Sequence, residues 1–430
     1  MNLKLNRRKF IKKTSMTMSA LPFLPALQRT EKYKLALIGC GWWGNNILYE
    51  AMQYGNCKIV GLCDVDQKAI ESTKEKVKQL LGDNPKVYGD YRELLNKEKP
   101  EIVIVGTPDH WHALPAITSI KSGAHVYLEK PIGHTIGEGQ AILRAAREFD
   151  RVVQVGTHRR ISPHNIAAMD FLNQGKAGKI SQVKAFINYN QNPGSPVADE
   201  DPPEGLDWDM YVGPASYQQF NPKIHPRGFR QFLNFANGTI ADWGIHWFDQ
   251  VLWWTEEKFP KSVYSTGGRF VKEDNADAPD TQMAIFEFEN FAMTWEHKLC
   301  ALNANTDHNV GCYFYGTEGT LHLGWIDGWT FYPSGKNKEI INYPATLHDP
   351  DKQNIKELWS DFMQSIDNNV RPVCDIEKGH LATNMSLLAM ISLKLGRSVA
   401  WDGNKEFILN DPEANQLLRR EYRGDWEYPI

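Results

Sequence analysis

The sequence of 430 residues lacks long hydrophobic runs and any excess of positive charge. No stretch approaches the roughly 20 apolar residues that a membrane-spanning helix requires, so we expect no membrane span. The net charge is −4 and no basic block stands out beyond the N-terminus, which argues against a nucleic-acid partner. Hydrophobic residues make up 42% and charged residues 23%, a composition that indicates a globular chain. At this length we expect two domains rather than one core.

Cysteine is scarce, and the six cysteines form neither a C-x-x-C motif nor a cluster with histidines. We therefore predict no metal site. Cys40, Cys57 and Cys63 lie in or beside apolar runs, where cysteine usually behaves as a small buried apolar residue. Cys300 and Cys312 could pair in an exported protein, but nothing in the sequence requires it.

Acidic residues are absent before Glu31. The chain starts instead with the basic segment Asn6-Arg-Arg-Lys-Phe-Ile-Lys-Lys13, and the weakly apolar segment Thr14–Leu27 follows. A twin-arginine export signal has this layout, and the adjacent arginines followed by Phe10 favour it over a disordered basic tail. We expect residues 1–30 to be such a signal and the protein to be periplasmic or otherwise exported.

A glycine-rich turn lies between two strand-like segments. The apolar run Tyr33–Ile38 enters Gly39-Cys-Gly41-Trp-Trp-Gly44, a helical pattern follows, and a second strand-like run ends at Asp64. The glycines permit a tight turn and the close approach of a pyrophosphate to a helix N-terminus. Asp64 lies 20 residues after Gly44, where a carboxylate would bind an adenosine ribose and repel a 2′-phosphate. We predict an NAD site, with NADP disfavoured; a glycine turn without a ligand is the alternative.

Strand and helix patterns continue to alternate up to residue 156. Buried strand patterns end before Thr107-Pro-Asp-His-Trp-His112 and before Glu129-Lys130-Pro131. The alternation predicts a doubly wound parallel sheet over residues 31–156, with its ligand at the carboxyl ends of the strands. For Glu129, a helix-capping or salt-bridge role is the alternative to cofactor contact. The cofactor-binding residues that we predict at this edge are Gly39, Gly41, Trp42, Trp43, Gly44, Asp64, Thr107, Pro108, His112, Glu129 and Lys130.

Residues 157–430 show a different pattern and form the predicted second domain. A helix over 165–174 precedes segments that alternate apolar and polar residues, at 180–189, 261–270, 281–288, 291–299 and 310–315. Their hairpin-like spacing predicts a large open antiparallel sheet, with one face covered by helices such as Ile376–Gly396. The tail Asp411–Ile430 has no regular pattern. The other face of the sheet is a candidate subunit contact.

Three residues carry the predicted chemistry: Lys130, Asp242 and His246. In Asp242-Trp-Gly-Ile-His246 the carboxylate and the imidazole are one helical turn apart if the segment is helical, so both can face one pocket. A cation, a carboxylate and an imidazole suffice to remove a proton from a sugar hydroxyl as a hydride leaves the same carbon. The alternatives are a metal site formed by Asp242, His246 and Asp249, or a His246 with only a structural role.

Tryptophan is abundant, and indole rings suit the C–H faces of a pyranose. Trp111 and Trp243 lie within the loop motifs, so we expect them in a sugar-binding pocket, whereas Trp253 and Trp254 are expected in the core. Arginines such as Arg160 could contact hydroxyls or an anionic group, and a structural role is their alternative.

Together these motifs resemble those of the glucose-fructose oxidoreductase/inositol dehydrogenase/MocA (Gfo/Idh/MocA) family. The resemblance covers nearly everything after residue 33, and Leu206–Pro214, Phe314–Thr320 and Glu421–Pro429 look like its exported bacterial branch. The resemblance implies an N-terminal Rossmann domain, a C-terminal α/β domain, NAD(P) as cofactor and a homodimer or homotetramer. For this branch it also implies twin-arginine export and a carbohydrate substrate.

Position by position, Lys130 matches the family's active-site lysine, which contacts cofactor and substrate, and His246 matches its acid/base histidine. Asp242 matches the aspartate that shares their pocket. The segment Val155-Gly-Thr-His158-Arg-Arg160 departs from the family at His158, where glutamine is common, so His158 is a second candidate base. The resemblance thus implies Lys130, Asp242 and His246 as catalytic residues, and Lys130, His158, Arg160, Asp242, Trp243 and His246 as substrate-binding residues.

The resulting prediction is NAD-dependent oxidation of a secondary hydroxyl on a sugar, glycoside or cyclitol. One alternative is a glycoside hydrolase in which NAD oxidises C3 transiently, elimination expels the aglycone and the hydride returns, without net redox change. The other is a non-catalytic sugar or cofactor sensor, which the intact set of Lys130, Asp242 and His246 argues against. Because free NAD is scarce outside the cytoplasm, we expect an exported enzyme to retain its cofactor.

Overall fold

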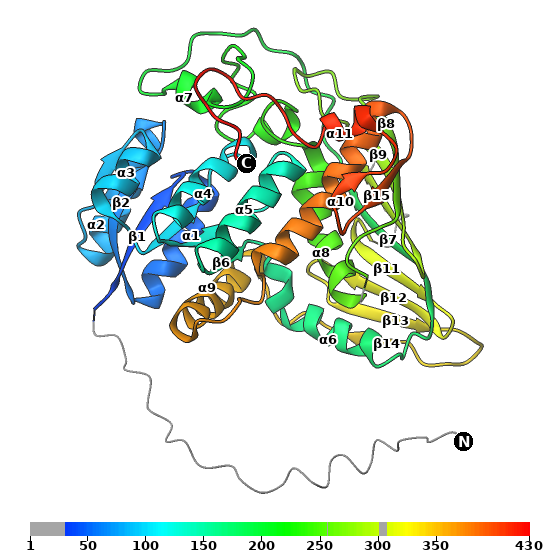
Figure 1. The fold of residues 1–430 in the computed structure, drawn as a ribbon. Helices are drawn as coiled ribbons and strands as arrows, with labels where there is room; N and C mark the ends of the chain where they lie inside the picture. Colours follow the sequence, from blue (N-terminus) through cyan, green and yellow to red (C-terminus); the bar gives the residue numbers. More distant parts are fainter. Residues whose placement is uncertain (1–30, 256, 301–307) are drawn as a thin grey trace, which may run out of the picture. The chain divides into compact units, whose positions relative to one another are not determined.

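The computed structural model describes residues 31–255, 257–300 and 308–430. The predicted export signal at 1–30 lies outside these residues. Two β-sheets organise the chain from Tyr33 onward (Figure 1). Among the described residues, no helix is both long and apolar enough to cross a membrane.

The first sheet has six parallel strands in the order β3-β2-β1-β4-β5-β6. Its strands are β1 (Tyr33–Ile38), β2 (Cys57–Cys63), β3 (Lys86–Tyr88), β4 (Ile102–Val105), β5 (His125–Leu128) and β6 (Val153–Val155). The connecting helices are α1 (Trp42–Tyr54), α2 (Gln67–Leu81), α3 (Tyr91–Glu98), α4 (Ala113–Lys121) and α5 (Ile136–Glu148). Every residue of β4 is buried, as expected for a central strand with helices on both faces. The predicted doubly wound parallel sheet is confirmed.

Local capping explains where several of these helices start. The Asp66 side chain accepts hydrogen bonds from the Lys68 and Ala69 amides and so begins α2. Thr135 and Glu138 form a reciprocal capping box at the start of α5. Both caps lie at the carboxyl edge of the sheet, so they fix the loops that follow β2 and β5.

The second sheet has ten strands in the order β14-β13-β12-β11-β7-β10-β9-β8-β15-β16. Its strands are β7 (Ile180–Asn188), β8 (Ser262–Gly268), β9 (Thr281–Glu287), β10 (Ala292–Lys298), β11 (Val310–Gly316), β12 (Gly319–Gly324), β13 (Trp329–Pro333), β14 (Ile341–Tyr343), β15 (Val399–Asp402) and β16 (Phe407–Ile408). The central pair β7 and β10 is parallel, so the sheet is mixed and mostly antiparallel rather than purely antiparallel as predicted. These two strands lie far apart in the sequence. Hairpin-like spacing predicts only the pairing of strands that follow one another, so it could not predict this parallel pair.

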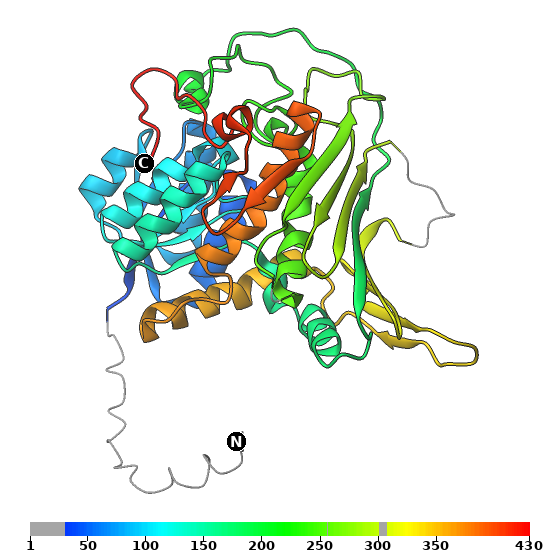
Figure 2. The ribbon, with the colours of Figure 1, turned by 45° about the vertical axis from the view of Figure 1, so that its right-hand side comes forward.

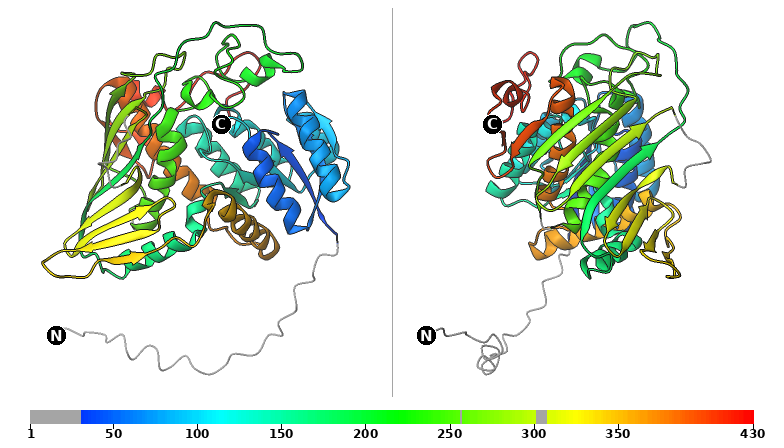
Figure 3. Two further views of the ribbon diagram at one scale, coloured as in Figure 1. Left: turned by 180° about the vertical axis from the view of Figure 1, so that it is seen from behind. Right: turned by 90° about the vertical axis from the view of Figure 1, so that its right-hand side faces the viewer.

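Helices cover one face of this sheet (Figure 2). They are α6 (Pro163–Asn173), α8 (Ile245–Trp254) and α10 (Ile376–Leu395), and the core between them and the sheet includes the fully buried Trp247 and Trp295. Strand β9 shows the resulting alternation, with Phe286 buried and Met283 about half exposed. The view in the right panel of Figure 3 looks onto the face without a helix layer.

A further helix, α9 (Pro350–Asn368), packs against α1 and completes the core of the first sheet. Its Trp359 stacks on Tyr127 of β5, with ring centroids 6.0 Å apart. This helix was not predicted from the sequence, although its first turn lies beside the reaction cavity. Asp351 in its first turn is thereby placed close to His158.

Two irregular segments pack over the carboxyl edge of the first sheet (Figure 1). The first surrounds the short helix α7 (Trp208–Val212) and has its own small apolar core. The second is the C-terminal tail, whose Tyr422 hydroxyl donates to Glu138 and whose Trp426 ring packs edge-on against Trp111. The tail was predicted to lack regular structure, but it contains the short helix α11 (Pro412–Gln416).

The six cysteines are free thiols. Cys312 is buried in the core of the second sheet and is not bonded to Cys300. Cys40, Cys57 and Cys63 are buried in the first domain, as their apolar neighbours predict.

Candidate active site

Two adjoining cavities lie at the carboxyl edge of the first sheet. The first, which we call the dinucleotide groove, is lined by loops after β1, β2 and β4 and by the segment around α7. Among its lining residues are Gly39, Gly41, Trp42, Trp43, Asp64, Thr107, Pro108, Trp111, Tyr211 and Arg230. The second, the reaction cavity, is lined by Trp42, Trp43, Glu129, Lys130, His158, Arg230, Asp242, Trp243, His246, Trp325 and Asp351. Trp42, Trp43 and Arg230 line both, so a ligand in the groove would reach the reaction cavity.

The glycine turn provides space at the start of α1. Gly39 has a φ of +96°, and a Cβ there would lie 2.6 Å from the Gly106 carbonyl carbon. Gly41 is the N-cap of α1, no side chain caps this helix, and a Cβ on Gly41 would meet nothing within 4 Å. The first-turn amides are therefore suited to a pyrophosphate. Gly44 has a packing role, because a Cβ there would lie 2.1 Å from the Gly39 carbonyl oxygen.

Asp64 closes the other end of the turn. Its Oδ2 accepts a hydrogen bond from the Cys40 amide at 2.6 Å, and its Oδ1 accepts one from the Asp66 amide at 3.0 Å. Burial raises the pKa of Asp64 to about 6 in spite of these hydrogen bonds, so the carboxylate is ionised at neutral pH. The groove thus carries a negative charge next to the uncharged Val65.

The loop after β4 presents Thr107 and Pro108 to the groove. The Thr107 hydroxyl is buried and has no hydrogen-bond partner among the described residues, which leaves it available to a ligand. His112 lies elsewhere: its Nδ1 is 2.5 Å from the Pro131 carbonyl oxygen and its Nε2 is 2.8 Å from that of Thr107. His112 is not among the residues that line the groove, and its two ring nitrogens connect two loops to each other.

Lys130, Asp242 and Arg230 form the charged centre of the reaction cavity. Lys130 Nζ donates to Asp242 Oδ1 at 2.8 Å and to the Asp242 carbonyl oxygen at 2.9 Å. Arg230 Nε lies 3.1 Å from the same Oδ1. Burial alone would raise the pKa of Asp242, but the two cations outweigh it and hold that pKa below its usual value. Asp242 is therefore a carboxylate, in the π-helical turn Ile240–Gly244 that precedes α8.

Two further carboxyl groups are buried beside this centre. Glu129 lines the reaction cavity, its Oε2 accepts from the Lys130 amide at 3.1 Å, and burial raises its pKa. Asp109 is 2% exposed, and burial raises its pKa to about 7, with Arg230 opposing and Asp242 reinforcing the shift. Asp109 lies inside the 107–112 motif but was not selected from the sequence, where nothing distinguishes it from a solvated loop aspartate.

His246 and His158 stand edge to face, with ring centroids 5.2 Å apart. Burial and then the charge of Lys130 lower the pKa of His246 well below its usual value, so the ring is neutral. Its Nδ1 has no hydrogen-bond partner among the described residues. His158 is also buried, with Nδ1 3.3 Å from Asn354 Nδ2 and Nε2 3.8 Å from Asp351 Oδ1. Two neutral imidazoles thus share the cavity, and His246 is the one with an unpartnered ring nitrogen.

Two indole rings line the reaction cavity together with Lys130. Trp243 and Trp325 lie 4.9 Å apart between centroids, and Trp325 lies 5.1 Å from the His246 ring. The Arg159 guanidinium lies 3.3 Å above Trp325 and donates to the Trp325 carbonyl oxygen and to Asp351. Trp325 is one of the tryptophans that the sequence placed in possible pocket segments, although it was not selected as a substrate-binding residue, and it lies in the cavity wall. Asp351 was not predicted, because it lies at the start of α9 without a recognisable motif.

Two predicted sugar-contact residues lie outside the reaction cavity. Arg160 Nε is 2.9 Å from both carboxylate oxygens of Asp249, and both side chains are buried. This ion pair gives Arg160 a structural role. It also occupies both carboxylate oxygens of Asp249, so Asp249 is not available to form a metal site with Asp242. Trp111 lines the dinucleotide groove instead, and its indole N–H donates to the Tyr211 carbonyl oxygen at 2.9 Å.

Several known proteins share part of this sequence. A segment of 161 residues is 26% identical to an alpha-N-acetylgalactosaminidase of Shewanella oneidensis and covers 36% of this chain and 35% of that protein. A segment of 213 residues is 26% identical to the putative oxidoreductase YteT of Bacillus subtilis and covers 49% of this chain and 42% of that protein. The chain thus spans well under two thirds of the length of these relatives.

Solved structures show the same fold over most of the chain. A levoglucosan dehydrogenase in complex with NADH and levoglucosan superposes with a TM-score of 0.66 at 16% identity, covering 86% of this chain and 99% of that one. The WlbA dehydrogenase from Bordetella pertussis in complex with NADH and UDP-GlcNAcA gives a TM-score of 0.65 at 16% identity, covering 86% and 99%.

Two family models match the sequence itself. Residues 33–157 match the NAD-binding Rossmann fold of an oxidoreductase family, and residues 179–428 match the C-terminal alpha/beta domain of an oxidoreductase family. Both models carry the Gfo/Idh/MocA designation, and together they cover both sheets and every lining residue of the two cavities except His158. The chain therefore belongs to the Gfo/Idh/MocA family of NAD-binding oxidoreductases.

Proposed function

We propose that this protein is an NAD-dependent oxidoreductase that acts on a secondary hydroxyl of a sugar, glycoside or cyclitol. The observation that carries the proposal is the gathering of Lys130, Asp242 and His246 in a cavity that adjoins the dinucleotide groove. When bound, the nicotinamide supplies the acceptor for the hydrogen and electron pair that leave the carbinol carbon.

The fit of the groove supports a dinucleotide. The uncapped first turn of α1, the open space at Gly41 and the unpartnered Thr107 hydroxyl are suited to its phosphates and polar groups. The Asp64 carboxylate favours NAD over NADP, because it would repel a 2′-phosphate. Asp64 would accept hydrogen bonds from the adenosine ribose in the place of one of its present amide partners.

His246 is proposed as the base. Its imidazole is neutral, so it can accept the hydroxyl proton, and the neighbouring Lys130 stabilises negative charge that develops on the substrate oxygen. Asp242 keeps the Lys130 ammonium in place through the 2.8 Å ion pair and is itself available to a neighbouring hydroxyl. Trp243 and Trp325 offer apolar faces to the sugar ring.

A second candidate is the redox-neutral glycoside hydrolase, and the similarity to an alpha-N-acetylgalactosaminidase favours it. Oxidation at C3 acidifies the C2–H bond, a base removes that proton, and the aglycone leaves from C1. Water then adds at C1 as a proton returns to C2, and the hydride returns to C3, so the net reaction is hydrolysis. His158 offers a second neutral imidazole for this step. Two backbone hydrogen bonds join the segment 205–211 to the residues after β2: the Gln67 amide donates to the Gly205 carbonyl oxygen, and the Asp207 amide donates to the Val65 carbonyl oxygen. Because these bonds hold one wall of the groove in place, they support a cofactor that stays bound between turnovers.

We also propose export and self-association. The basic start with Arg7 and Arg8 supports a twin-arginine signal, and N-terminal sequencing of the native protein should find a start near residue 31.

On the outer face of the second sheet, Tyr264, Met283 and Ile285 are 42%, 52% and 50% exposed, which supports a homodimer or homotetramer. Met283→Lys should lower the mass seen by light scattering, and a monomeric wild type would refute the association.

One purification and one assay test the catalytic proposal. Mass spectrometry of the denatured protein should first identify NAD released from it. The protein is then incubated with a panel of aryl glycosides and free sugars while NADH and free aglycone are both measured. NADH formed in proportion to substrate supports the oxidoreductase, whereas aglycone without NADH supports the hydrolase. Neither product on any substrate, with NAD bound, would leave only the sensor function.

A further inference from the structure

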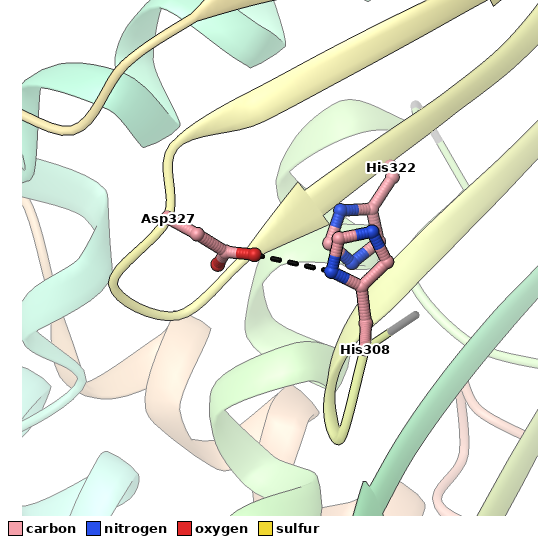
Figure 4. Close-up of side chains that lie close together, drawn as sticks. All are labelled: His308, His322 and Asp327. Atoms are coloured by element: carbon pink, nitrogen blue, oxygen red, sulfur yellow. Dashed lines mark hydrogen bonds and ion pairs between the residues drawn. The ribbon is translucent and has the colours of Figure 1, made fainter. Parts of the chain in front are cut away.

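A cluster of two histidines and one aspartate lies outside both cavities. His308 precedes β11, His322 lies in β12, and Asp327 lies in the turn between β12 and β13. One donor atom from each residue lies within 4.8 Å of the other two. Figure 4 shows the two imidazoles face to face, with the Asp327 carboxylate at their edge.

Each of the three side chains has a donor turned toward the others. His308 Nδ1 lies 3.1 Å from Asp327 Oδ2. The His308 and His322 ring centroids are 3.5 Å apart with the planes 17° from parallel. His322 is 1% exposed, and its Nε2 is buried without a hydrogen-bond partner among the described residues. A buried polar nitrogen of this kind normally finds a partner, so its isolation points to a ligand.

Two glycines make room for this arrangement. Gly311 of β11 and Gly324 of β12 are directly paired across the two strands. A Cβ on Gly311 would lie 2.5 Å from His322 Nε2, and a Cβ on Gly324 would lie 1.7 Å from Asp327 Oδ1. Any other residue at either position would displace a member of the cluster. The paired glycines therefore allow the imidazole and the carboxylate to lie against the backbone.

We propose that His308, His322 and Asp327 bind a divalent transition-metal ion, with Zn²⁺ as the natural candidate. Imidazole nitrogens with one carboxylate oxygen suit Zn²⁺ and its neighbours in the first transition row, whereas Ca²⁺ and Mg²⁺ prefer all-oxygen sites. Bonds of about 2.0–2.2 Å to a tetrahedral ion place donor atoms roughly 3.3–3.6 Å apart. The His308–Asp327 pair, at 3.1 Å, is close to this spacing, and the donor atom of His322 lies within 4.8 Å of both.

Solvent completes the coordination. Asp327 is 46% exposed and His308 is 20% exposed, so an ion has an entry path and a water ligand fills the fourth position. The ion would join the start of β11 to the turn after β12. Trp325 lies between two of the ligands, His322 and Asp327, in the sequence, and it forms part of the wall of the reaction cavity. The site is thus structural, and it holds the segment that carries Trp325.

Titration calorimetry on the full-length, tag-free protein, stripped with a chelator and dialysed, tests the site. We expect one Zn²⁺ per chain, and we expect Co²⁺ to give visible d–d bands on binding. Asp327→Asn and His308→Ala each remove a ligand that is exposed or partly exposed, so neither variant changes the core. Each should weaken binding by at least about 10–100-fold, the loss seen even for outer-shell partners.

His348→Ala is the matched control, because His348 is exposed, precedes Asp349 and lies outside the cluster. It should bind Zn²⁺ as tightly as the wild type, and the melting temperature of both should rise with Zn²⁺. The melting temperature of Asp327→Asn should not respond. Absence of a saturable one-to-one site in the wild type, or unchanged affinity in both ligand variants, would overturn the proposal. The assay does not use catalytic activity, so it is independent of the proposed reaction.

Discussion

Lys130 Nζ and Asp242 Oδ1 lie 2.8 Å apart, although 112 residues separate them in the sequence. The first follows β5 of the Rossmann sheet, and the second precedes α8 of the second domain. This ion pair fixes the position of a cation in the reaction cavity, which adjoins the dinucleotide groove. Its position next to the two neutral imidazoles makes it the first target for mutation.

Lys130→Ala should reduce kcat at least about 10²–10³-fold, the loss typical of a missing charge-stabilising donor. Initial rates of NADH formation or aglycone release, whichever the enzyme shows, provide the measurement. Lys130→Arg is the control that keeps the charge and should lose less activity than Lys130→Ala. Equal activity of Lys130→Ala and the wild type would show that the developing charge is stabilised elsewhere, with Arg230 as the nearest candidate.

His246→Ala should reduce kcat about 10²–10⁴-fold while NAD remains bound, because a general base contributes about this much. His158→Ala is the matched comparison, since both rings are buried and 5.2 Å apart. We expect the smaller loss for His158→Ala, whose ring nitrogens have neighbours in Asn354 and Asp351. The reverse order would make His158 the base.

The sequence predicted the parts of the site that lie within local motifs. Lys130 follows a buried strand, and Asp242 and His246 share one turn of helix, so spacing alone places them on a pocket. Asp351 was missed, and Trp325 was only one of several tryptophans in the expected pocket segments, because the end of β12 and the start of α9 reach the cavity only through tertiary packing. Alternation of strands and helices likewise predicted the first sheet.

Long-range pairing explains the remaining errors. The parallel contact between β7 and β10 joins strands that are not neighbours in the sequence, and no turn signals it. Arg159 and Arg160 are adjacent in a 3₁₀ turn, yet one lies over Trp325 and the other pairs with Asp249. The His308, His322 and Asp327 cluster matches no metal-binding motif, because strand pairing rather than local spacing brings its members together.

Asp64→Ser should reduce the preference for NAD over NADP at least about tenfold, because juxtaposed like charges cost several kcal/mol. The ratio of kcat/KM for the two cofactors, or of their dissociation constants, measures this. The pKa of Asp64 is raised to about 6, so in the wild type the carboxylate loses its charge below that pH. The preference for NAD should therefore also weaken from pH 7 to pH 5. A preference that is unchanged by both the substitution and the pH would assign selectivity to another residue.

Asp109→Asn should make the protein less sensitive to alkaline pH. The pKa of Asp109 is about 7 in the folded protein against 3.8 for the free group, so the folded state binds the proton more tightly. Its contribution to stability is present below the unfolded value and decreases as pH rises through the folded value. The fall in melting temperature between pH 5 and pH 8 should be smaller in Asp109→Asn than in the wild type. An identical fall in both proteins would mean that Asp109 is ionised across this range.

Arg160→Met should destabilise the fold without a specific loss of substrate affinity. The substitution leaves the Asp249 carboxylate buried and unpaired, which typically costs about 3–5 kcal/mol. Denaturant unfolding measures the loss, and the double variant Arg160→Met/Asp249→Leu should recover much of it because no buried charge remains. At a temperature where the variants stay folded, KM should be close to that of the wild type. A raised KM in the stable double variant would instead restore Arg160 as a substrate-binding residue.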